Sequence, residues 1–178
     1  MTQAANSFPP VLQASSQLLR FENPLHQGSH RFLRFPLNTE INGLLPLADL
    51  RGVINVTLTE ILPVPQVGEF LLGIMNWRGE AIWILDLAGL LGAMHWYRRE
   101  ALPASGMAML IQVENQTVGL LVEQVSTIET YDPEERLSVS ESMLPAQLQS
   151  FLQGYFVDLQ GRPLMLLDTH AVIQALKT

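Results

Sequence analysis

Residues 70–91 read FLLGIMNWRGEAIWILDLAGLL. Two apolar runs flank the polar segment Asn76-Trp77-Arg78-Gly79-Glu80. The run Ile82-Trp83-Ile84-Leu85 is apolar at every position, which is typical of a strand that is covered on both faces. Gly79 stands where the chain has to reverse, and glycine adopts the positive φ of tight turns at little cost. The stretch therefore predicts two strands with Gly79 in the turn between them.

A second stretch, FLQGYFVDLQGRPLMLLDTHAVI at 151–173, repeats the first. Four residues recur in the same order: Phe70, Gly73, Gly79 and Asp86 match Phe151, Gly154, Gly161 and Asp168. Residues 31–45 (RFLRFPLNTEINGLL) also lie over 107–121 (MAMLIQVENQTVGLL) without a gap. Two copies are too few for a solenoid, so the repeat predicts a pseudo-symmetric domain with two lobes.

Two aspartates and a second glycine complete this repeated unit. Asp86 and Asp168 each end an apolar run and precede a short helical pattern, which is clearest over residues 169–177. An aspartate at a helix N-cap accepts a backbone hydrogen bond and complements the helix dipole. We therefore interpret both aspartates as helix caps, and Gly161 as a turn residue like Gly79.

The remaining patterns are mostly those of β-strands. Residues 107–113 and 118–125 are apolar runs joined by the polar loop Glu114-Asn115-Gln116-Thr117, which predicts a hairpin. Residues 56–62 have β-branched side chains at alternate positions and stop at Pro63. Pro36 interrupts the first expected strand, which we therefore expect to be an edge strand or to be bulged. Short strands, tight turns and duplication together predict a mainly β fold with two small barrels and short helices.

Composition and charge exclude several classes of protein. The 178 residues are 48% hydrophobic and 15% charged, enough to bury a core in one domain or two small lobes. The net charge is −7 and basic residues cluster only at Arg98-Arg99, so we expect no nucleic-acid partner. The sequence has no cysteine, no secretory signal at its start and no apolar stretch of about 18 residues. We expect a cytoplasmic protein that does not insert into a membrane.

The repeat also gives the expected domain boundaries. Residues 1–30 lie outside it and are rich in Gln, Ser, Asn and Pro, so we expect a flexible N-terminal arm. Residues 31–178 then form the folded domain. Its first lobe covers about 31–92, a linker follows at about 93–106, and the second lobe covers about 107–178. An exchange of strands between the lobes is compatible with these boundaries.

No residue pattern points to catalysis or to a cofactor. The four histidines, His26, His30, His95 and His170, form no ligand cluster of the HExxH kind, so we expect no metal site. The sequence has no nucleophile elbow, phosphate-binding loop or dinucleotide fingerprint. A small-molecule sensor that uses a barrel interior is a further alternative, but small barrels are usually filled by their own side chains. We therefore expect neither an enzyme nor a bound cofactor.

At this point the motifs resemble those of a known family. The pattern Gly-x-x-Asn-x-Arg-Gly-(x)6-Asp, here Gly73, Asn76, Arg78, Gly79 and Asp86, is similar to the signature of the CheW family of chemotaxis coupling proteins. The approach Val64-Pro-x(4)-Phe-Leu-x-Gly and the later segment 118–125 (VGLLVEQV) are similar too. The order of these motifs along about 31–176 makes the resemblance fairly specific. The sequence Asn-Trp-Arg-Gly-Glu at 76–80 looks closer to that of variants that serve type IV pili, twitching or phototaxis than to that of the flagellar type.

The resemblance implies a fold and a function. It implies a pair of SH3-like five-stranded barrels and no catalysis. CheW-like proteins bind the regulatory domain of a CheA-type histidine kinase and the cytoplasmic tip of a methyl-accepting chemoreceptor. The chain would then be an adaptor that couples receptor to kinase in chemotaxis, phototaxis or twitching motility. A CheW-like module that serves another signalling assembly is the alternative.

The same resemblance suggests the residues of an interface. The family's arginine at the position of Arg78 is associated with receptor coupling, and a guanidinium presents five fixed donors to a partner. Trp77 would supply an apolar anchor beside it, although alternation along the strand also fits a core position. Asn76, Glu80 and Gly73 complete the expected interface. The second copy has Asp158-Leu159-Gln160-Gly161-Arg162 in place of the first turn, so the two edges cannot recognise the same surface.

Overall fold

The structure is a computed structural model that describes residues 28–38, 40–92, 104–140 and 142–176. The expected N-terminal arm, up to residue 27, and most of the expected linker, residues 93–103, lie outside the described residues. Within the described ranges the chain forms ten strands and three short α-helices. The first five strands are β1 (His30–Pro36), β2 (Asn42–Pro46), β3 (Leu50–Thr57), β4 (Leu71–Trp77) and β5 (Glu80–Asp86). The other five are β6 (Ser105–Val113), β7 (Gln116–Val122), β8 (Ile128–Tyr131), β9 (Leu152–Val157) and β10 (Pro163–Leu167). The helices are α1 (Leu87–Leu90), α2 (Ala146–Gln149) and α3 (Thr169–Ala175), with 3₁₀ turns η1 (Leu58–Glu60) and η3 (Pro133–Glu135).

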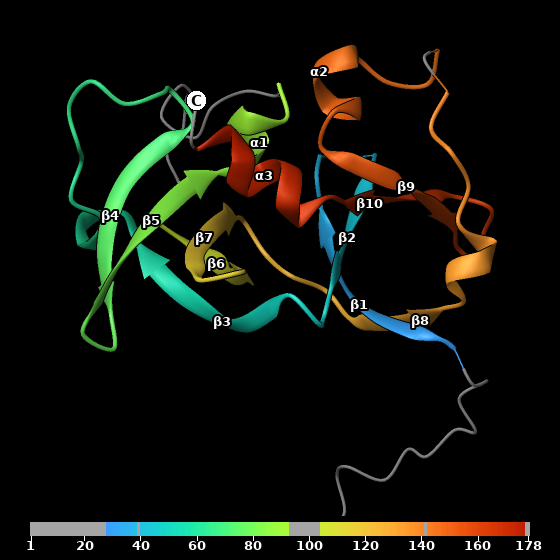
Figure 1. Cartoon of the computed structure of the whole chain (residues 1–178), viewed down its shortest axis with the longest axis horizontal. Coiled ribbons are helices and arrows are strands. Elements are labelled where there is room, and N and C mark those ends of the chain that lie inside the picture. The colour runs from blue at the N-terminus through green and yellow to red at the C-terminus, as the bar shows by residue number, and fades with distance from the viewer. Residues whose placement is uncertain (1–27, 39, 93–103, 141, 177–178) are drawn as a thin grey trace, which may run out of the picture.

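The strands form two five-stranded sheets that lie side by side along the long axis (Figure 1). One sheet, called barrel A here, has the strand order β8-β1-β2-β10-β9. The other, called barrel B, has the order β3-β6-β7-β5-β4. The expected fold class is confirmed: the protein is mainly β, with two five-stranded units.

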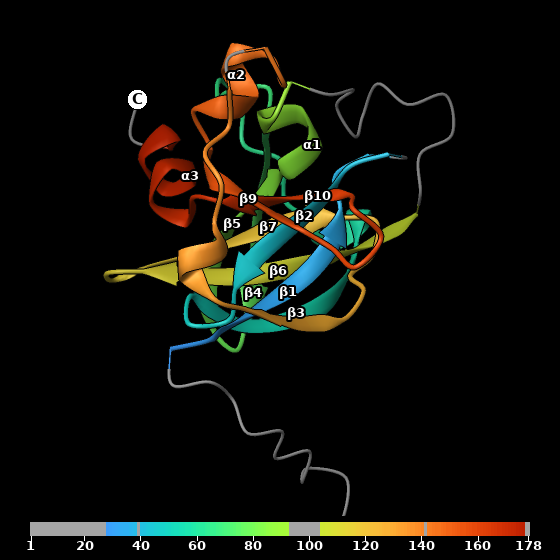
Figure 2. The same cartoon turned by 90° about the vertical axis from the view of Figure 1, so that its right-hand side faces the viewer.

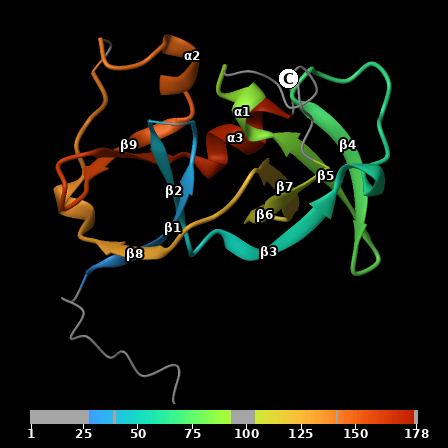
Figure 3. The same cartoon turned by 180° about the vertical axis from the view of Figure 1, so that it is seen from behind.

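The two barrels have the same topology with the halves of the repeat exchanged. If the first five strands are matched in order to the last five, the strand order of barrel A becomes that of barrel B. Each barrel therefore contains strands of both copies, joined by the parallel pairs β2–β10 and β5–β7. The connections from β2 to β3 and from β7 to β8 pass from one barrel to the other (Figure 3). The ranges 31–92 and 107–178 are thus copies in the sequence, but neither range forms one barrel by itself, because each barrel takes strands from both.

Each barrel is closed by an isolated bridge that crosses one glycine. Leu62 exchanges two backbone hydrogen bonds with Ile74 of β4, at 2.8 and 3.0 Å. In barrel A, Leu137 pairs with Tyr155 of β9 in the same way, at 2.8 and 2.9 Å. Gly73 and Gly154 precede the bridged strand residues and have φ values of 143° and 145°. A Cβ on either glycine would collide with the carbonyl oxygen of the crossing segment, so both positions require glycine.

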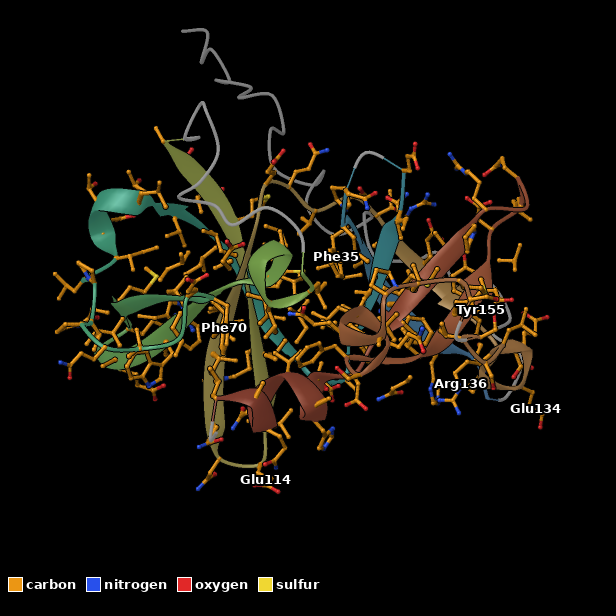
Figure 4. All side chains as sticks on the ribbon, turned by 90° about the horizontal axis from the view of Figure 1, so that it is seen from above. Phe35, Phe70, Glu114, Glu134, Arg136 and Tyr155 are labelled. Atoms are coloured by element: carbon orange, nitrogen blue, oxygen red, sulfur yellow. The ribbon has the colours of Figure 1, made fainter. Side chains whose placement is uncertain are left out.

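The core has three parts. Each barrel has a small apolar interior of its own. A larger cluster fills the space between the barrels and takes side chains from both sheets and from α1 and α3. Phe35, which is fully buried, lies in this central cluster between the two sheets (Figure 4). All three α-helices lie on the same side of the sheets (Figures 1 and 2), and no described helix is long and apolar enough to cross a membrane.

Some local expectations differ from the structure. The β6–β7 connection is the two-residue turn Glu114-Asn115, because Gln116 already pairs with Val113; Figure 4 shows Glu114 at the tip of this hairpin. The strand expected at 56–62 lies earlier in the sequence, at 50–57, and is β3. It ends at Thr57, which is the N-cap of η1 and whose backbone N–H donates to Glu60 Oε2 at 2.8 Å. Strand β1 lies inside its sheet, and Pro36 is its last residue, beyond the segment that pairs with β8.

Candidate functional site

The turn between β4 and β5 has an unusual backbone. Arg78 and Gly79 have φ values of 54° and 87°, and the side-chain Oδ1 of Asn76 accepts a hydrogen bond from the Gly79 N–H at 3.0 Å. Two successive positive φ values are typical of a type I′ hairpin turn, which suits Gly79. A non-glycine residue in this region is uncommon, and such strain is often found at functional sites. The turn therefore holds the exposed Arg78 in a conformation that costs free energy.

A cluster of charged and aromatic side chains surrounds this turn. Trp77 is half-buried and packs at the edge of the barrel B interior. The Cζ atoms of Arg51 and Arg78 lie 5.1 and 5.0 Å from the centre of the Trp77 ring, within the range of cation–π contacts. Arg51 also contacts Glu80, with 3.9 Å between Nη1 and Oε2. We call Arg51, Trp77, Arg78 and Glu80 the barrel B rim cluster.

The rim cluster contains three of the five residues expected at an interface. Asn76 shapes the turn beside it and is itself exposed. Gly73 is placed differently: it is buried under the Leu62 crossing and contributes no side chain to the surface. Arg51 was missed, because the sequence has no pattern that relates it to a turn 26 residues later. The interface role of the five expected residues stays a prediction.

The other singled-out residues shape the chain locally. Asp86 is fully buried, and its Oδ1 accepts a hydrogen bond from the N–H of Gly89 at 3.1 Å, at the start of α1. Asp168 accepts in the same way from the N–H of Ala171 at 3.0 Å, at the start of α3. Gly161 has a φ of 78° in the turn between β9 and β10, as Gly79 has between β4 and β5. These contacts belong to the repeated frame and expose no reactive group.

The turn between β9 and β10 is held by its own ion pair. Asp158 Oδ1 accepts hydrogen bonds from the backbone N–H groups of Gln160 and Arg162, both at 2.9 Å. Its Oδ2 accepts from Arg162 Nε at 2.9 Å and lies 2.8 Å from Arg162 Nη2. These bonds, above all the one from the Arg162 backbone, hold the pKa of Asp158 below its ordinary value. The turn leaves Leu159 fully exposed at its tip, with Val157 44% exposed beside it.

A charged network lies inside the same end of barrel A. Arg34 projects from β1 with a side chain that is only 14% exposed. Its Nη1 donates to Glu129 Oε1 at 3.0 Å, and its Nη2 lies 3.6 Å from Asp158 Oδ2. Tyr131 donates its hydroxyl to the other oxygen of Glu129. The network thus joins β1, β8 and the β9–β10 turn, and the sequence analysis missed it.

The protonation of this network follows from its contacts. Burial raises the pKa of Glu129, but hydrogen bonds from Tyr131 and Arg34 outweigh burial, and the pKa lies below its ordinary value. Burial and the bond to the Glu129 carboxylate raise the pKa of Tyr131. Glu129 is therefore a carboxylate and Tyr131 a neutral phenol at neutral pH, which is the arrangement that the hydrogen bonds require.

The charged side chains that the structure describes at the two barrel ends were compared with the requirements of metal binding and nucleophilic catalysis. Within the described residues, no three His, Asp or Glu side chains lie close enough together to hold a metal ion. The charged groups at both ends are paired with each other or stacked on Trp77, and none is arranged as a nucleophile beside a base. Trp83, expected to be covered on both faces, is 37% exposed on the outer face of β5.

Comparison with known proteins gives the family. Residues 31–177 match the family described as CheW-like domain. A probable chemotaxis protein CheW of Rhizobium etli is 30% identical over 114 residues, which are 62% of this chain and 66% of that protein. The chemotaxis protein CheW of Rhizobium meliloti is 28% identical over 130 residues, 72% of this chain and 76% of that protein.

A solved structure has the same fold. The crystal structure of the scaffolding protein TtCheW from Thermoanaerobacter tengcongensis aligns with a TM-score of 0.64 at 20% identity, over 78% of this chain and 88% of that chain. This likeness supports the pair of five-stranded units described above. Because the family match spans most of the sequence, the chain belongs to the CheW-like domain family.

Proposed function

We propose that this protein is a non-catalytic adaptor that couples methyl-accepting chemoreceptors to a CheA-type histidine kinase. The observation that carries the proposal is the family match over residues 31–177. Two relatives have names that say chemotaxis protein, and the solved structure has a title that says scaffolding protein. An adaptor needs two distinct surfaces, and the two barrel ends of this chain differ in charge and shape.

The barrel B rim cluster is the surface we assign to the receptor or to the kinase array. It combines an exposed arginine in a strained turn with a half-buried tryptophan. Tryptophan and arginine are the residues that most often dominate the binding free energy of protein interfaces. Within the described part of the chain Arg78 has no hydrogen bond or ion pair, so its donors are available to a partner.

The test is a binding and coupling experiment with the full chain. The purified protein is titrated with a chemoreceptor cytoplasmic-tip fragment and with the kinase regulatory domain, both from the same organism. We expect both to bind, and kinase autophosphorylation to respond to the receptor only when the chain is present. Arg78→Ala is expected to weaken binding by about 1–3 kcal/mol without a change in melting temperature.

A matched control separates this effect from a simple change of charge. Arg31 is an exposed arginine of β1 in barrel A, and Arg31→Ala alters the net charge by the same amount as Arg78→Ala. We expect Arg31→Ala to bind like the wild type. Absence of binding to both fragments, or turnover of a substrate by the purified chain, would contradict the proposed function.

A further inference from the structure

The two arginines of the barrel B rim cluster are engaged differently. Arg51 Nη1 donates to Thr117 Oγ1 of β7 at 3.1 Å and also faces Glu80. Among the described residues, Arg78 contacts the Trp77 ring and makes no hydrogen bond or ion pair. Arg51 is therefore held by the protein itself, while the donors of Arg78 remain unused.

The backbone explains why Arg51 is the fixed member. Arg51 lies in β3, one edge strand of the barrel B sheet, and its neighbours Leu50 and Gly52 pair with β6; β4 is the other edge strand. From there its side chain reaches over Trp77 toward the start of β5 and β7. The contacts of Arg51 thus connect four strands, β3, β4, β5 and β7, around one indole ring.

Holding the indole also restricts Arg78. A free arginine side chain has about 2 kcal/mol of rotamer entropy, part of which is lost when it binds a partner. Arg78 has its guanidinium 5.0 Å from the centre of a ring that Arg51 contacts at 5.1 Å. A ring that is fixed by one arginine offers the other a fixed surface, so less freedom remains to be lost on binding.

We propose that Arg51 is a positioning residue, which holds Trp77 and through it aims Arg78 at a carboxylate of the partner. The inference rests on the proposed function, in which this turn contacts a partner. The chemistry of the partner follows from the charge of the rim. Two arginines lie together here in a chain whose net charge is −7, and the Glu80 carboxylate contacts Arg51 but not Arg78. We take the complementary surface to be an acidic segment of the chemoreceptor tip, and kinase binding through this rim is the alternative outcome that the test would reveal.

The first arm of the test is a double-mutant cycle in the full chain. Binding of the chemoreceptor cytoplasmic-tip fragment is measured for wild type, Arg51→Ala, Arg78→Ala and the double variant. We expect Arg51→Ala to weaken binding about three- to tenfold, since an exposed or partly desolvated cation–π contact has this magnitude. The double variant should bind no more weakly than Arg78→Ala, because Arg51 acts through Arg78.

Two results of the cycle would overturn the proposal. Losses that multiply in the double variant would mean that Arg51 contacts the partner directly. An Arg51→Ala variant that binds like the wild type would mean that Arg51 has no part in recognition. Arg51→Lys keeps the charge but loses the planar group that stacks on indole, so we expect it to resemble Arg51→Ala.

The second arm needs no partner. Because the Arg78 guanidinium lies 5.0 Å from the centre of the Trp77 ring, we expect the ring to shift the NMR resonances of the Arg78 side chain and Arg51→Ala to move them toward free-arginine values. Arg31→Ala serves as the control with the same change of charge and should leave them in place. Unchanged Arg78 resonances in Arg51→Ala would refute positioning. If the wild type binds neither receptor nor kinase fragment, the proposed function fails, and these resonances still decide the role of Arg51.

Discussion

Barrel A and barrel B have equivalent strands of the repeat in the same order, yet their equivalent ends contain side chains of different chemistry. In barrel B the interior is apolar, and the half-buried Trp77 closes it under a turn that presents Arg78. In barrel A an arginine, a glutamate and an aspartate occupy the same end, under a turn that presents Leu159. The two turns lie at opposite ends of the long axis (Figures 1 and 3).

The difference shows which parts of the repeat belong to the fold and which are free to vary. Arg34 in barrel A corresponds to Leu110 in barrel B, because residues 31–45 lie over 107–121. Leu110 is fully buried, whereas Arg34 needs two carboxylates to be accommodated. Gly73 and Gly154, in contrast, have the same conformation and the same collision partner in both barrels. The glycine-dependent closure is therefore common to both barrels, whereas the side chains that fill their ends differ from one barrel to the other.

The largest expected effect concerns this shared closure. Gly73→Ala and Gly154→Ala each combine positive-φ strain with a Cβ that collides with a backbone carbonyl, so each should destabilise the fold by roughly 2–5 kcal/mol. Gly79→Ala, at a φ of 87° but in open space, is the control and should cost about 1 kcal/mol. Urea unfolding measures all three. A small effect at only one of the two closures would break the equivalence of the barrels.

The next effect concerns the filling of barrel A. Arg34→Ala leaves Glu129 and Asp158 without their shared cation, and we expect a loss of about 3 kcal/mol of stability. Glu129 corresponds to Ile54, since each is paired with the matching residue of β1 or β6. Arg34→Leu combined with Glu129→Ile therefore gives barrel A the residues of barrel B and should recover most of the loss. A double variant as unstable as Arg34→Ala would show that the two interiors cannot be exchanged.

A smaller effect depends on pH. The pKa values of Glu129 and Asp158 lie below their ordinary values of 4.5 and 3.8, so both carboxylates bind protons less readily in the folded state. Their contribution to stability is complete above the ordinary values and is lost as the pH falls through the lowered ones. Unfolding free energies measured from pH 7 to about pH 3 should fall less steeply for Arg34→Leu with Glu129→Ile than for the wild type. Parallel curves would contradict the role of the network.

The smallest effect is expected at the barrel A turn. Leu159 is fully exposed, so Leu159→Ser should change the unfolding free energy by no more than about 0.5 kcal/mol. The matched change in barrel B, Trp77→Ser, removes a half-buried ring and should cost several times more. Thermal unfolding of the two variants gives the comparison directly. Similar melting temperatures would mean that Trp77 is no part of the barrel B interior.

The sequence predicted the repeated frame because each of its signals is local. The glycines of the turns and the aspartates at the helix starts act within four residues of their partners. The capping pattern Thr57-Leu58-Thr59-Glu60 was equally local, and it could have shown that β3 ends at Thr57. The exchange of strands between the barrels could not be derived in this way, because it depends on residues that are far apart in the sequence. Gly43 pairs with Met165, and Gly119 pairs with Ile84.

Both side-chain clusters were harder to predict for a related reason. In β1 the faces alternate, so Phe32 and Arg34 point one way and Leu33 and Phe35 the other. Both faces are buried, one inside barrel A and the other between the barrels, and alternation alone does not tell them apart. Arg51 and Trp77 lie on β3 and β4, the two edge strands of one sheet, so they meet only when the sheet closes into a barrel.

The interleaved strand order has a consequence for synthesis on the ribosome. All strands of barrel B fall between residues 50 and 122, so they emerge as one continuous segment. The first two strands of barrel A emerge earlier, but their partners β8, β9 and β10 are translated last. Until β8, β9 and β10 are translated, β1 and β2 have no strand to pair with but each other, while all strands of barrel B are already available to fold. Barrel A is thus completed around a finished companion.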